Sequence, residues 1–384
     1  MSRNVVLLGA TGSIGRNACR VARELPGHLR VSGMSGFRNI PQLAAEANRL
    51  RPDALAVPDD ASAAQLRALL GYEPEAVFTG EEGLCRLAVW PAADTVLVAI
   101  VGTGGLRPTL AALEAGKDIA LASKEVLVMA GEIVMAAAQR AGRRILPVDS
   151  EHNAIFQCLE GRDARHVQRL ILTASGGPFR TWAPGRLRAV TREEALRHPT
   201  WRMGEKITID SATLFNKGLE MIEARWLFGL GIDRIGVVIH PQSIVHSMVE
   251  FVDGSVLAQM SHSDMRFPIQ YALTWPERLP GSLPPLEWAR VGRLDFEEPR
   301  RDVFPALDLA RQAAERGGIA PAVLNAANEV AVAEFLAGRI AFPRIWDIVG
   351  EVLDRTADRA AASLDIVLQA DRAARETAAV AARA

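Results

Sequence analysis

Short apolar runs alternate with amphipathic segments from residue 4 to residue 148, and this pattern constrains the fold more than any other feature of the chain. The apolar runs read NVVLLG, LRVSGM, ALAV, TVLVAIVG, DIALAS and RRILPV. Helical patterns such as IPQLAAEANRLR and RPTLAALEAG lie between them. Wholly apolar strands bridged by helices are typical of a parallel sheet buried on both faces. We therefore expect residues 1–148 to form an α/β domain with a doubly wound, Rossmann-like sheet.

The pattern changes in the central part of the chain. The stretch RIGVVIHPQSIVHSMVEFVDGSVLAQM holds consecutive strand patterns, and Asp253-Gly254 between the second and third is a strong hairpin signal. We expect a partly antiparallel sheet in an α+β catalytic domain over residues 149–275.

Prolines then concentrate in residues 276–300, at positions Pro276, Pro280, Pro284, Pro285 and Pro299. This concentration predicts an extended linker. Helical patterns fill the rest of the chain, so residues 301–384 are predicted to form a helical domain. A length of 384 residues is enough for these parts.

The charge balance and the cysteines argue against several classes of protein. The formal net charge is −1, from 44 basic and 45 acidic side chains, so nothing indicates binding to nucleic acid or to an anionic membrane. Cys19, Cys85 and Cys158 lie far apart and in no metal-binding spacing, which indicates reduced thiols. No stretch reaches the roughly 18 to 20 apolar residues of a membrane span. We expect a soluble cytoplasmic protein.

The first motif with chemical content is GATGSIG, Gly9 to Gly15, which lies between a predicted strand and a predicted helix. Its glycines permit a tight turn and the close approach of a pyrophosphate to the helix N-terminus, whose free N–H groups favour an anion. Thr11 and Ser13 add hydroxyl donors. The motif predicts a dinucleotide site, and a bare tight turn is the alternative.

The end of the second predicted strand indicates which dinucleotide binds. An NAD site usually has an acidic residue there for the ribose 2′-hydroxyl, whereas an arginine suits a 2′-phosphate. This chain has Arg38 followed by Asn39, and no acid. We therefore expect NADPH, and an ordinary surface arginine is the alternative.

Two carboxylates, Asp149 and Glu151, flank Ser150 directly after a predicted buried strand. On an extended chain they would project from the same side and repel each other, a conflict that a hard divalent cation such as Mg²⁺ or Mn²⁺ resolves. The alternative is a helix N-terminus, with Asp149 or Ser150 as its cap and Glu151 in the first turn.

A further group of polar residues lies in DSATLFNKGLEMIEARWLF, residues 210–228. If a helix begins near Asn216, then Asn216, Lys217 and Glu220 share one face near its start. Ser211 is expected upstream, in a loop. Together these residues suit a phosphate, with Glu220 available to a cation, and helix caps with an ordinary ion pair are the alternative.

Two loops complete the candidate site. The segment TASGGPF, residues 173–179, offers Ser175 and open backbone N–H groups to the same anion, or is a plain turn. The segment RHPTWRMGEK, residues 197–206, combines an imidazole, a large aromatic side chain and a glycine, a composition suited to a lid that closes over a substrate. Simple surface packing of Trp201 is the alternative.

Several long motifs follow GATGSIG in order: ASKEVLVMAGE, PVDSEHNAIFQCLEG, SGGPF, HPTWRMGEKITIDSATLFNKGLEMIEARWLF and NAANEVAVAEFL. From residue 5 to about residue 350, the chain resembles the 1-deoxy-D-xylulose 5-phosphate reductoisomerase family. The resemblance implies an NADPH- and divalent-metal-dependent enzyme, both oxidoreductase and isomerase, that acts as a homodimer. The reaction implied is the conversion of 1-deoxy-D-xylulose 5-phosphate to 2-C-methyl-D-erythritol 4-phosphate, on the methylerythritol phosphate route to isoprenoid precursors.

The resemblance also implies roles for individual positions. It implies that the ligands of one Mg²⁺ or Mn²⁺ are Asp149, Glu151 and Glu220, which would be catalytic together with Lys124. It implies that the substrate is bound by Lys124, Ser150, Glu151, Ser175, His198, Trp201, Ser211, Asn216 and Lys217, with Met203 also in the lid. It implies that NADPH is bound by Thr11, Gly12, Ser13, Ile14, Arg38, Asn39, Ser123, Glu125 and Gly204.

Phe37, Ser123 and Ala174 depart from the family's commoner pattern, and the first two affect details of the cofactor pocket. Two other functions remain open on the residues alone. One is an NADPH-dependent dehydrogenase that acts on another small phosphorylated substrate without a metal, which would leave the three carboxylates unexplained. The other is a non-catalytic NADPH sensor, which would not need a phosphate site.

Overall fold

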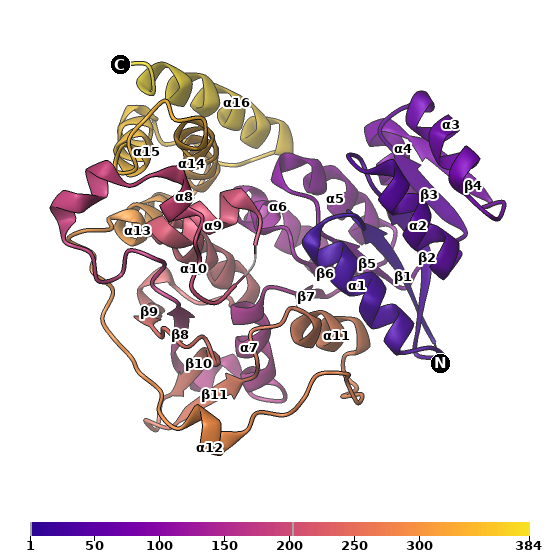
Figure 1. The fold of residues 1–384 in the computed structure, drawn as a ribbon, viewed down its shortest axis with the longest axis horizontal. Helices are drawn as coiled ribbons and strands as arrows, with labels where there is room; N and C mark the ends of the chain where they lie inside the picture. The colour runs from indigo at the N-terminus through magenta and orange to yellow at the C-terminus, as the bar shows by residue number, and fades with distance from the viewer. Residues whose placement is uncertain (1, 202) are drawn as a thin grey trace. The chain divides into compact units, whose positions relative to one another are not determined.

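The computed structural model describes residues 2–201 and 203–384 (Figure 1). The chain forms two compact units: unit 1 comprises the residues up to Val126, 134–153 and 264–284, and unit 2 comprises 127–133, 154–263 and 285–384. Arg202, inside the predicted lid, lies outside the described residues. Within the described part of the chain, we find no helix both long and apolar enough to cross a membrane.

A seven-stranded sheet forms the centre of unit 1. Its strands are β1 Arg3–Leu8, β2 Leu29–Ser35, β3 Ala54–Val57, β4 Ala76–Thr79, β5 Thr95–Val98, β6 Asp118–Leu121 and β7 Ile145–Pro147. They lie in the order β4-β3-β2-β1-β5-β6-β7, and every neighbouring pair is parallel. Strands β3 and β5 are buried along their whole length, as expected of internal strands covered on both faces. The predicted parallel, doubly wound sheet is confirmed.

Helices connect these strands and add a later segment of the chain to unit 1. They are α1 Ser13–Glu24, α2 Ile40–Leu50, α3 Asp60–Leu69, α4 Gly80–Ala88, η1 Gly102–Gly105, α5 Leu106–Glu114, α6 Lys124–Ala141, α7 Ser150–Leu159 and α11 Arg266–Thr274. Residues 127–133 of α6 and 154–159 of α7 belong to unit 2. Helix α11 packs against α1, β1 and β7, so residues 264–284 belong to unit 1. The sequence placed these residues in the central domain and the linker, because an apolar helix face does not indicate which sheet it will cover. The four-part division by residue range stays a prediction.

A four-stranded mixed sheet lies in unit 2. Its strands are β8 Val167–Ala174, β9 Ile235–Ile239, β10 Val245–Phe251 and β11 Val256–Met260, in the order β11-β10-β8-β9. Strand β10 is antiparallel to β8 and β11, whereas β8 and β9 are parallel. The predicted hairpin is confirmed at Asp253-Gly254, where Gly254 has a φ of +83° and Asp253 Oδ1 accepts the N–H of Ser255 at 2.9 Å.

Helices make up most of the remainder of unit 2. They are η2 Ala164–His166, η3 Pro184–Ala189, α8 Arg192–Ala195, α9 Glu205–Thr213, α10 Phe215–Phe228, η4 Ile232–Arg234, α12 Trp288–Val291, α13 Ala306–Arg316, α14 Ala320–Leu336, α15 Arg344–Arg355 and α16 Leu364–Ala381. The predicted C-terminal helices are confirmed. They share a core with the segment after β8, because the buried ring of Phe342 lies 5.1 Å from Phe179, 5.5 Å from Phe335 and 5.6 Å from Trp346, measured between centroids.

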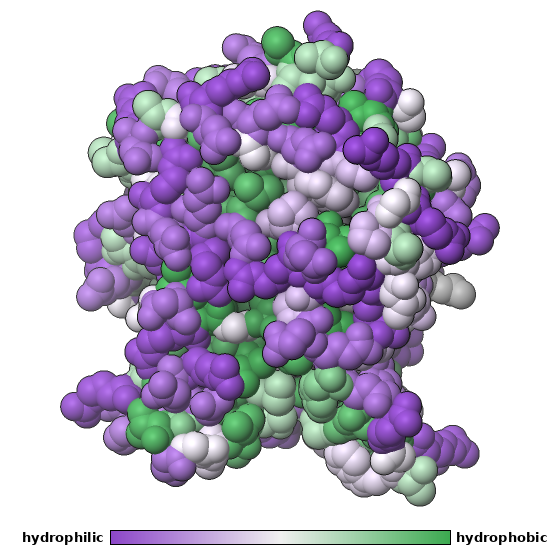
Figure 2. All heavy atoms as spheres, turned by 90° about the vertical axis from the view of Figure 1, so that its left-hand side faces the viewer, coloured by the Kyte–Doolittle hydropathy of each residue, from purple (hydrophilic) through white to green (hydrophobic). Residues whose placement is uncertain are grey.

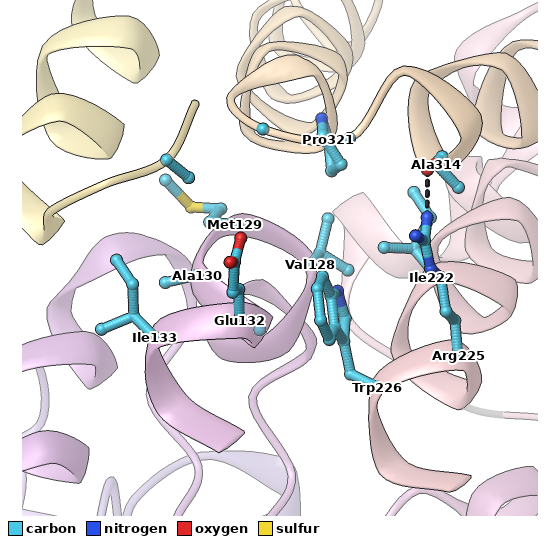
Figure 3. Close-up of a pocket in the computed structure, with 14 residues that line it drawn as sticks. Val128, Met129, Ala130, Glu132, Ile133, Ile222, Arg225, Trp226, Ala314 and Pro321 are labelled. Atoms are coloured by element: carbon cyan, nitrogen blue, oxygen red, sulfur yellow. Dashed lines mark hydrogen bonds between the residues drawn. The ribbon is translucent and has the colours of Figure 1, made fainter. Parts of the chain in front are cut away.

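Helix α6 is interrupted at Ala130, where φ is −133° and ψ is 28°. Gly131 follows, and the indole of Trp226 on α10 lies directly against it. A Cβ atom at Gly131 would come within 2.5 Å of Trp226 Nε1. Figure 3 shows Trp226 beside Val128 of α6, with Arg225 reaching the carbonyl oxygen of Ala314. The close approach of α6 to α10 therefore requires glycine at position 131.

We expect Gly131→Ala to destabilise the protein by about 1 to 3 kcal/mol, because the added methyl group overlaps the indole of Trp226. Gly350→Ala is the matched control: Gly350 lies inside α15, and the nearest atom to its added Cβ would be Leu309 Cδ2 at 3.8 Å. That variant should be neutral or slightly stabilising, since alanine favours a helix. Thermal unfolding of both variants tests the packing, and equal melting temperatures would contradict it.

Candidate active site

The glycine loop of unit 1 follows β1, next to the point where the strand order reverses. Gly9 has a φ of +91°, and a Cβ there would lie 2.9 Å from the carbonyl carbon of Ala99. A Cβ on Gly15 would lie 2.5 Å from the Cα of Ala10, so both glycines are required by backbone contacts. Gly12 is the N-cap of α1, and no side chain caps the helix there. The first N–H groups of α1 are therefore suited to an anion.

The predicted cofactor residues of this loop lie at the surface of unit 1. Gly12 and Ser13 are exposed, and Thr11 and Ile14 are partly exposed. The loop after β2 lies beside them, because a Cβ on Gly36 would be 2.9 Å from Thr11 Cγ2. Arg38 follows as an exposed side chain.

Asn39, also predicted to line the cofactor, caps helix α2. Its Oδ1 accepts the N–H of Gln42 at 3.0 Å. The cap fixes the start of α2 directly after Arg38 and so limits where the guanidinium can reach.

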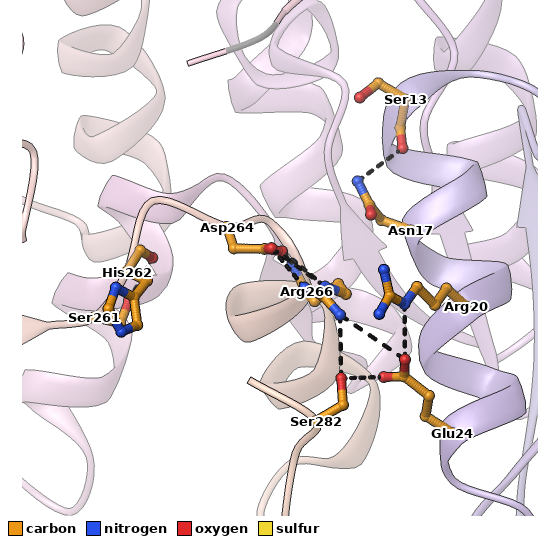
Figure 4. A network of polar contacts seen from close by, with 9 residues as sticks. All are labelled: Ser13, Asn17, Arg20, Glu24, Ser261, His262, Asp264, Arg266 and Ser282. Atoms are coloured by element: carbon orange, nitrogen blue, oxygen red, sulfur yellow. Dashed lines mark hydrogen bonds and ion pairs between the residues drawn. The ribbon is translucent and has the colours of Figure 1, made fainter. Parts of the chain in front are cut away.

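A polar network ties the start of the chain to the segment around α11 (Figure 4). Arg20 donates to Glu24 at 2.7 Å, and Ser282 donates to the other carboxylate oxygen of Glu24 at 2.7 Å. Arg266 donates to Ser282 at 3.1 Å and pairs with Asp264 at 2.8 Å. The network holds α1, whose N-terminus follows the glycine loop, against α11.

Helix α6 begins with three predicted site residues. Ser123 is its N-cap and is buried, with its Oγ accepting the N–H of Ile100 at 2.9 Å and donating to the carbonyl of Ile100 at 2.6 Å. This hydroxyl therefore fixes the end of β5. Lys124 forms an ion pair with Asp149, and Glu125 is buried in the first turn.

The extended geometry expected at Asp149 and Glu151 is wrong, because helix α7 begins at Ser150. Asp149 Oδ1 accepts the N–H of Glu151 at 3.2 Å, and the carbonyl of Asp149 accepts the N–H of Asn153 at 2.8 Å. Ser150 donates to Glu151 Oε2 at 2.8 Å. The helix-cap alternative describes the backbone correctly. It does not exclude a metal, since Oδ1 of Asp149 serves as the cap while Oδ2 faces Lys124.

Ser175 follows β8 in a turn that only glycines can form. Gly176 and Gly177 have φ values of +81° and +67°. The N–H of Gly177 donates to Ser175 Oγ at 3.2 Å. A Cβ on Gly177 would lie 2.9 Å from the Cα of Ala212, so the turn rests directly on helix α9.

His198 joins two serines to the backbone of the lid segment. Its Nε2 lies 2.9 Å from Ser175 Oγ and 3.0 Å from Ser211 Oγ. Its Nδ1 accepts the N–H groups of Thr200 at 3.2 Å and Trp201 at 2.9 Å. Because Nδ1 is an acceptor, the proton of the neutral ring is on Nε2, and both serine oxygens accept from it. The hydroxyl hydrogens of Ser175 and Ser211 are then left to donate to another group.

Burial lowers the pKa of His198 to about 4, so the imidazole is neutral near pH 7. His246, on β10, lies beside the predicted lid, with its ring centroid 6.2 Å from that of Trp201. Burial lowers the pKa of His246 to about 4 as well, with a smaller contribution from Lys217. A histidine within an apolar strand pattern indicates a structural role from the sequence, and that interpretation stays a prediction.

Ser211 lies in helix α9, and the expectation that it occupies a loop is wrong. The segment EKITIDSAT alternates polar and β-branched residues, which hides its helical period. Gly204 is the exposed N-cap of α9, so the predicted lid ends there. Leu214 follows α9 with a φ of +67° and turns the chain directly into α10.

Helix α10 begins one residue before the predicted Asn216 and presents the expected face. Asn216 Nδ2 donates to Glu220 Oε1 at 2.6 Å, and Lys217 forms an ion pair with Glu220. Lys217 and Glu220 are both buried. The Oδ1 of Asn216 is buried and has no hydrogen-bond partner among the described residues.

Unit 2 therefore gathers a set of donors suited to a phosphate. Two serine hydroxyls and the imidazole of His198 form one group. The amide of Asn216 and the ammonium group of Lys217 follow on α10, five and six residues after Ser211. The serine hydroxyls are partly buried and the ammonium is buried, although Asn216 and Lys217 also meet the carboxylate of Glu220.

Family models match three parts of the chain. Residues 5–131 match "1-deoxy-D-xylulose 5-phosphate reductoisomerase", residues 145–228 match its C-terminal domain, and residues 260–377 match the "DXP reductoisomerase C-terminal domain". A 1-deoxy-D-xylulose 5-phosphate reductoisomerase of Symbiobacterium thermophilum is 54% identical, covering 98% of each chain. One of Chloroherpeton thalassium is 49% identical, covering 96% of this chain and 95% of the relative.

Solved structures agree with these matches. The reductoisomerase of Zymomonas mobilis in complex with NADPH is 42% identical, with a TM-score of 0.94 and 100% of both chains covered. A second reductoisomerase structure, with NADPH, fosmidomycin and magnesium, is 41% identical, with a TM-score of 0.92 over 99% of this chain and 98% of the other. This chain belongs to the 1-deoxy-D-xylulose 5-phosphate reductoisomerase family.

Proposed function

We propose that this chain rearranges and reduces 1-deoxy-D-xylulose 5-phosphate to 2-C-methyl-D-erythritol 4-phosphate, with NADPH and a divalent cation, in isoprenoid precursor biosynthesis. The observation that carries the proposal is a phosphate-type donor set in unit 2 of a chain that is 54% identical to a reductoisomerase over nearly its full length. The glycine loop of unit 1, where the backbone leaves no space for side chains at Gly9 and Gly15, supports the proposal that NADPH is the cofactor.

For NADPH, the pyrophosphate would meet the N-terminus of α1 at Gly12, Ser13 and Ile14, with Thr11 beside them. Arg38 would pair with the 2′-phosphate, because an exposed guanidinium offers two parallel donors to a phosphate. The loop fits this cofactor, since Gly9 and Gly15 leave no space for a side chain and bring the backbone close. By position, Asn39, Ser123, Glu125 and Gly204 complete the proposed cofactor site.

For the metal, the proposed ligands are the three carboxylates of Asp149, Glu151 and Glu220. Their oxygen atoms are hard donors, which suits Mg²⁺ and Mn²⁺. Lys124 forms an ion pair with Asp149, and Lys217 forms one with Glu220. When bound, the cation polarises substrate oxygens as a Lewis acid, and NADPH supplies hydride to the rearranged carbon skeleton.

The chain's own residues would position the substrate. Ser175, Ser211, Asn216 and Lys217 would hold its phosphate, while Lys124 and Ser150 would contact the carbon skeleton. Neutral His198 would donate from Nε2 without adding a charge. Trp201 and Met203 would cover the substrate and exclude water, so that remote phosphate binding serves the chemistry.

We also propose a cytoplasmic homodimer. Strand β11 is an edge strand of the unit 2 sheet, and such an edge presents unpaired backbone groups to a partner. Large apolar side chains are exposed on β11, on its hairpin and in the linker, namely Val252, Val256, Leu257, Trp288 and Phe296. Figure 2 shows a face that is mostly hydrophilic, with apolar residues reaching the surface in its lower part. A second copy of the chain would cover such a surface.

The function is tested by following NADPH oxidation with 1-deoxy-D-xylulose 5-phosphate, with and without Mg²⁺ or Mn²⁺. We expect turnover only with the metal, and Asp149→Asn should lower metal affinity by roughly tenfold to a hundredfold, together with turnover, because it removes one anionic ligand. Glu220→Gln should have the same effect, and the double variant should lose less than the sum.

Glu114→Gln, an exposed carboxylate at the end of α5, is the matched control and should change neither quantity. Absence of turnover by the wild-type chain would refute the proposed function. If Asp149→Asn lowered thermal stability but changed neither metal affinity nor turnover, Asp149 would act as a helix cap and not as a metal ligand.

Arg38→Asp should raise the KM for NADPH by about tenfold to a hundredfold and leave the KM for NADH nearly unchanged. The substitution removes a charge-assisted contact and adds repulsion against the 2′-phosphate. Arg67→Asp, at an exposed arginine of α3, controls for the change in net charge. An equal increase in the KM for NADPH and for NADH would show that Arg38 does not bind the 2′-phosphate.

The two nitrogens of His198 can be tested separately. In His198→Asn the amide oxygen stands near the place of Nδ1 and keeps an acceptor for Trp201, whereas in His198→Gln the amide reaches toward Ser175 and Ser211. Both variants should raise the KM for the substrate. Only the glutamine variant should be cleaved faster by trypsin after Arg197, by about threefold or more, since it releases the lid backbone. Identical cleavage of the two variants would contradict the lid contact.

A further inference from the structure

Helix α14 carries two buried asparagines on an otherwise apolar surface. Asn325 and Asn328 are both 0% exposed and lie one turn apart. Asn328 Nδ2 donates to Asp210 Oδ1 on helix α9 at 2.8 Å, whereas Asn325 Nδ2 donates to Glu329 Oε1 on its own helix at 3.0 Å. Of the two asparagines, only Asn328 therefore forms a hydrogen bond to α9, the helix that carries Ser211.

Asp210 is a buried carboxylate that depends on this link. It is 1% exposed, and its Oδ2 pairs with Lys206 on the same helix at 2.6 Å. Lys206 lies one turn earlier in α9, so this ion pair cannot fix the helix relative to its surroundings. The amide of Asn328 is the contact that ties Asp210 to another helix. A buried carboxylate oxygen left without a donor is costly, so α9 is held where that amide meets it.

The next residue along α9 is Ser211, whose Oγ lies 3.0 Å from His198 Nε2. The backbone of Ser211 and Ala212 also supports the glycine turn of Ser175, through Gly177. A rotation or shift of α9 by a fraction of a turn would move both serines away from the imidazole. Buried polar contacts between apolar helices are known to fix register in this way.

We propose that Asn328, in the C-terminal helical part of the chain, is a positioning residue for the phosphate site and acts through Asp210 on Ser211. The C-terminal helices thereby set substrate affinity as well as stability. This inference rests on the proposed function, since it assigns a partner to the phosphate-binding helix of that site.

The test compares Asn328→Leu with Asn325→Leu. Leucine keeps the branched shape of asparagine and suits the apolar surface of α14, so both variants should fold. Each loses one amide donor at 0% exposure on the same helix, and only one of them loses a contact with α9. Asn328→Ala and Asn325→Ala repeat the comparison with smaller side chains.

We expect Asn328→Leu to raise the KM for 1-deoxy-D-xylulose 5-phosphate, and the inhibition constant of inorganic phosphate, by about threefold to tenfold. The KM for NADPH should not change, and Asn325→Leu should change none of these constants, even if both variants lose similar thermal stability. Equal constants for the two variants, with the wild type active, would overturn the role of Asn328. An inactive wild type would instead overturn the proposed function itself.

Discussion

Two buried carboxylates organise the candidate site, and a lysine and an amide meet each of them, because an uncompensated buried charge is strongly destabilising. Glu220 is fully buried, and Lys217 and Asn216 from the preceding turn of α10 meet it. Asp210 depends in the same way on Lys206 and Asn328. The groups that pair with these carboxylates are also the groups proposed to meet a phosphate or to position its ligands. Stability and function therefore rely on the same side chains.

The corner between α9 and α10 shows what this arrangement costs. Leu214 adopts a left-handed conformation, with a φ of +67°, which costs a non-glycine residue of order 1 to 3 kcal/mol. Burial of the side chains of Leu214 and Phe215 offsets that cost. The corner separates Ser211, in the last turn of α9, from Asn216 and Lys217, in the first turn of α10, by only a few residues. A loop would provide the same residues without fixing their directions.

Much of this could be predicted from the sequence, because it depends on local pattern. The apolar runs identified six strands of the parallel sheet, and the glycine spacing identified the loop before α1. Strand β4, AVFT, was missed, and all four of its residues are only partly buried. Strand β8 was missed because polar Gln168 and Arg169 follow its first residue.

Other features depend on contacts between distant residues and leave no local signal. Helix α11 joins unit 1 from far along the chain, Gly131 is required by an indole on α10, and Asn328 meets a carboxylate on α9. The roles of the individual site residues also stay predictions, since the sequence shows which groups occur and not which of them meet a ligand.

The central claim is that Asp149, Glu151 and Glu220 act together on one divalent cation. Anomalous diffraction from crystals grown with Mn²⁺, NADPH and a phosphonate analogue of the substrate tests it most directly. The account predicts one Mn²⁺ peak bonded to oxygens of all three carboxylates. A Mn²⁺ peak bonded to other residues, with these three carboxylates paired only to lysines, would contradict it.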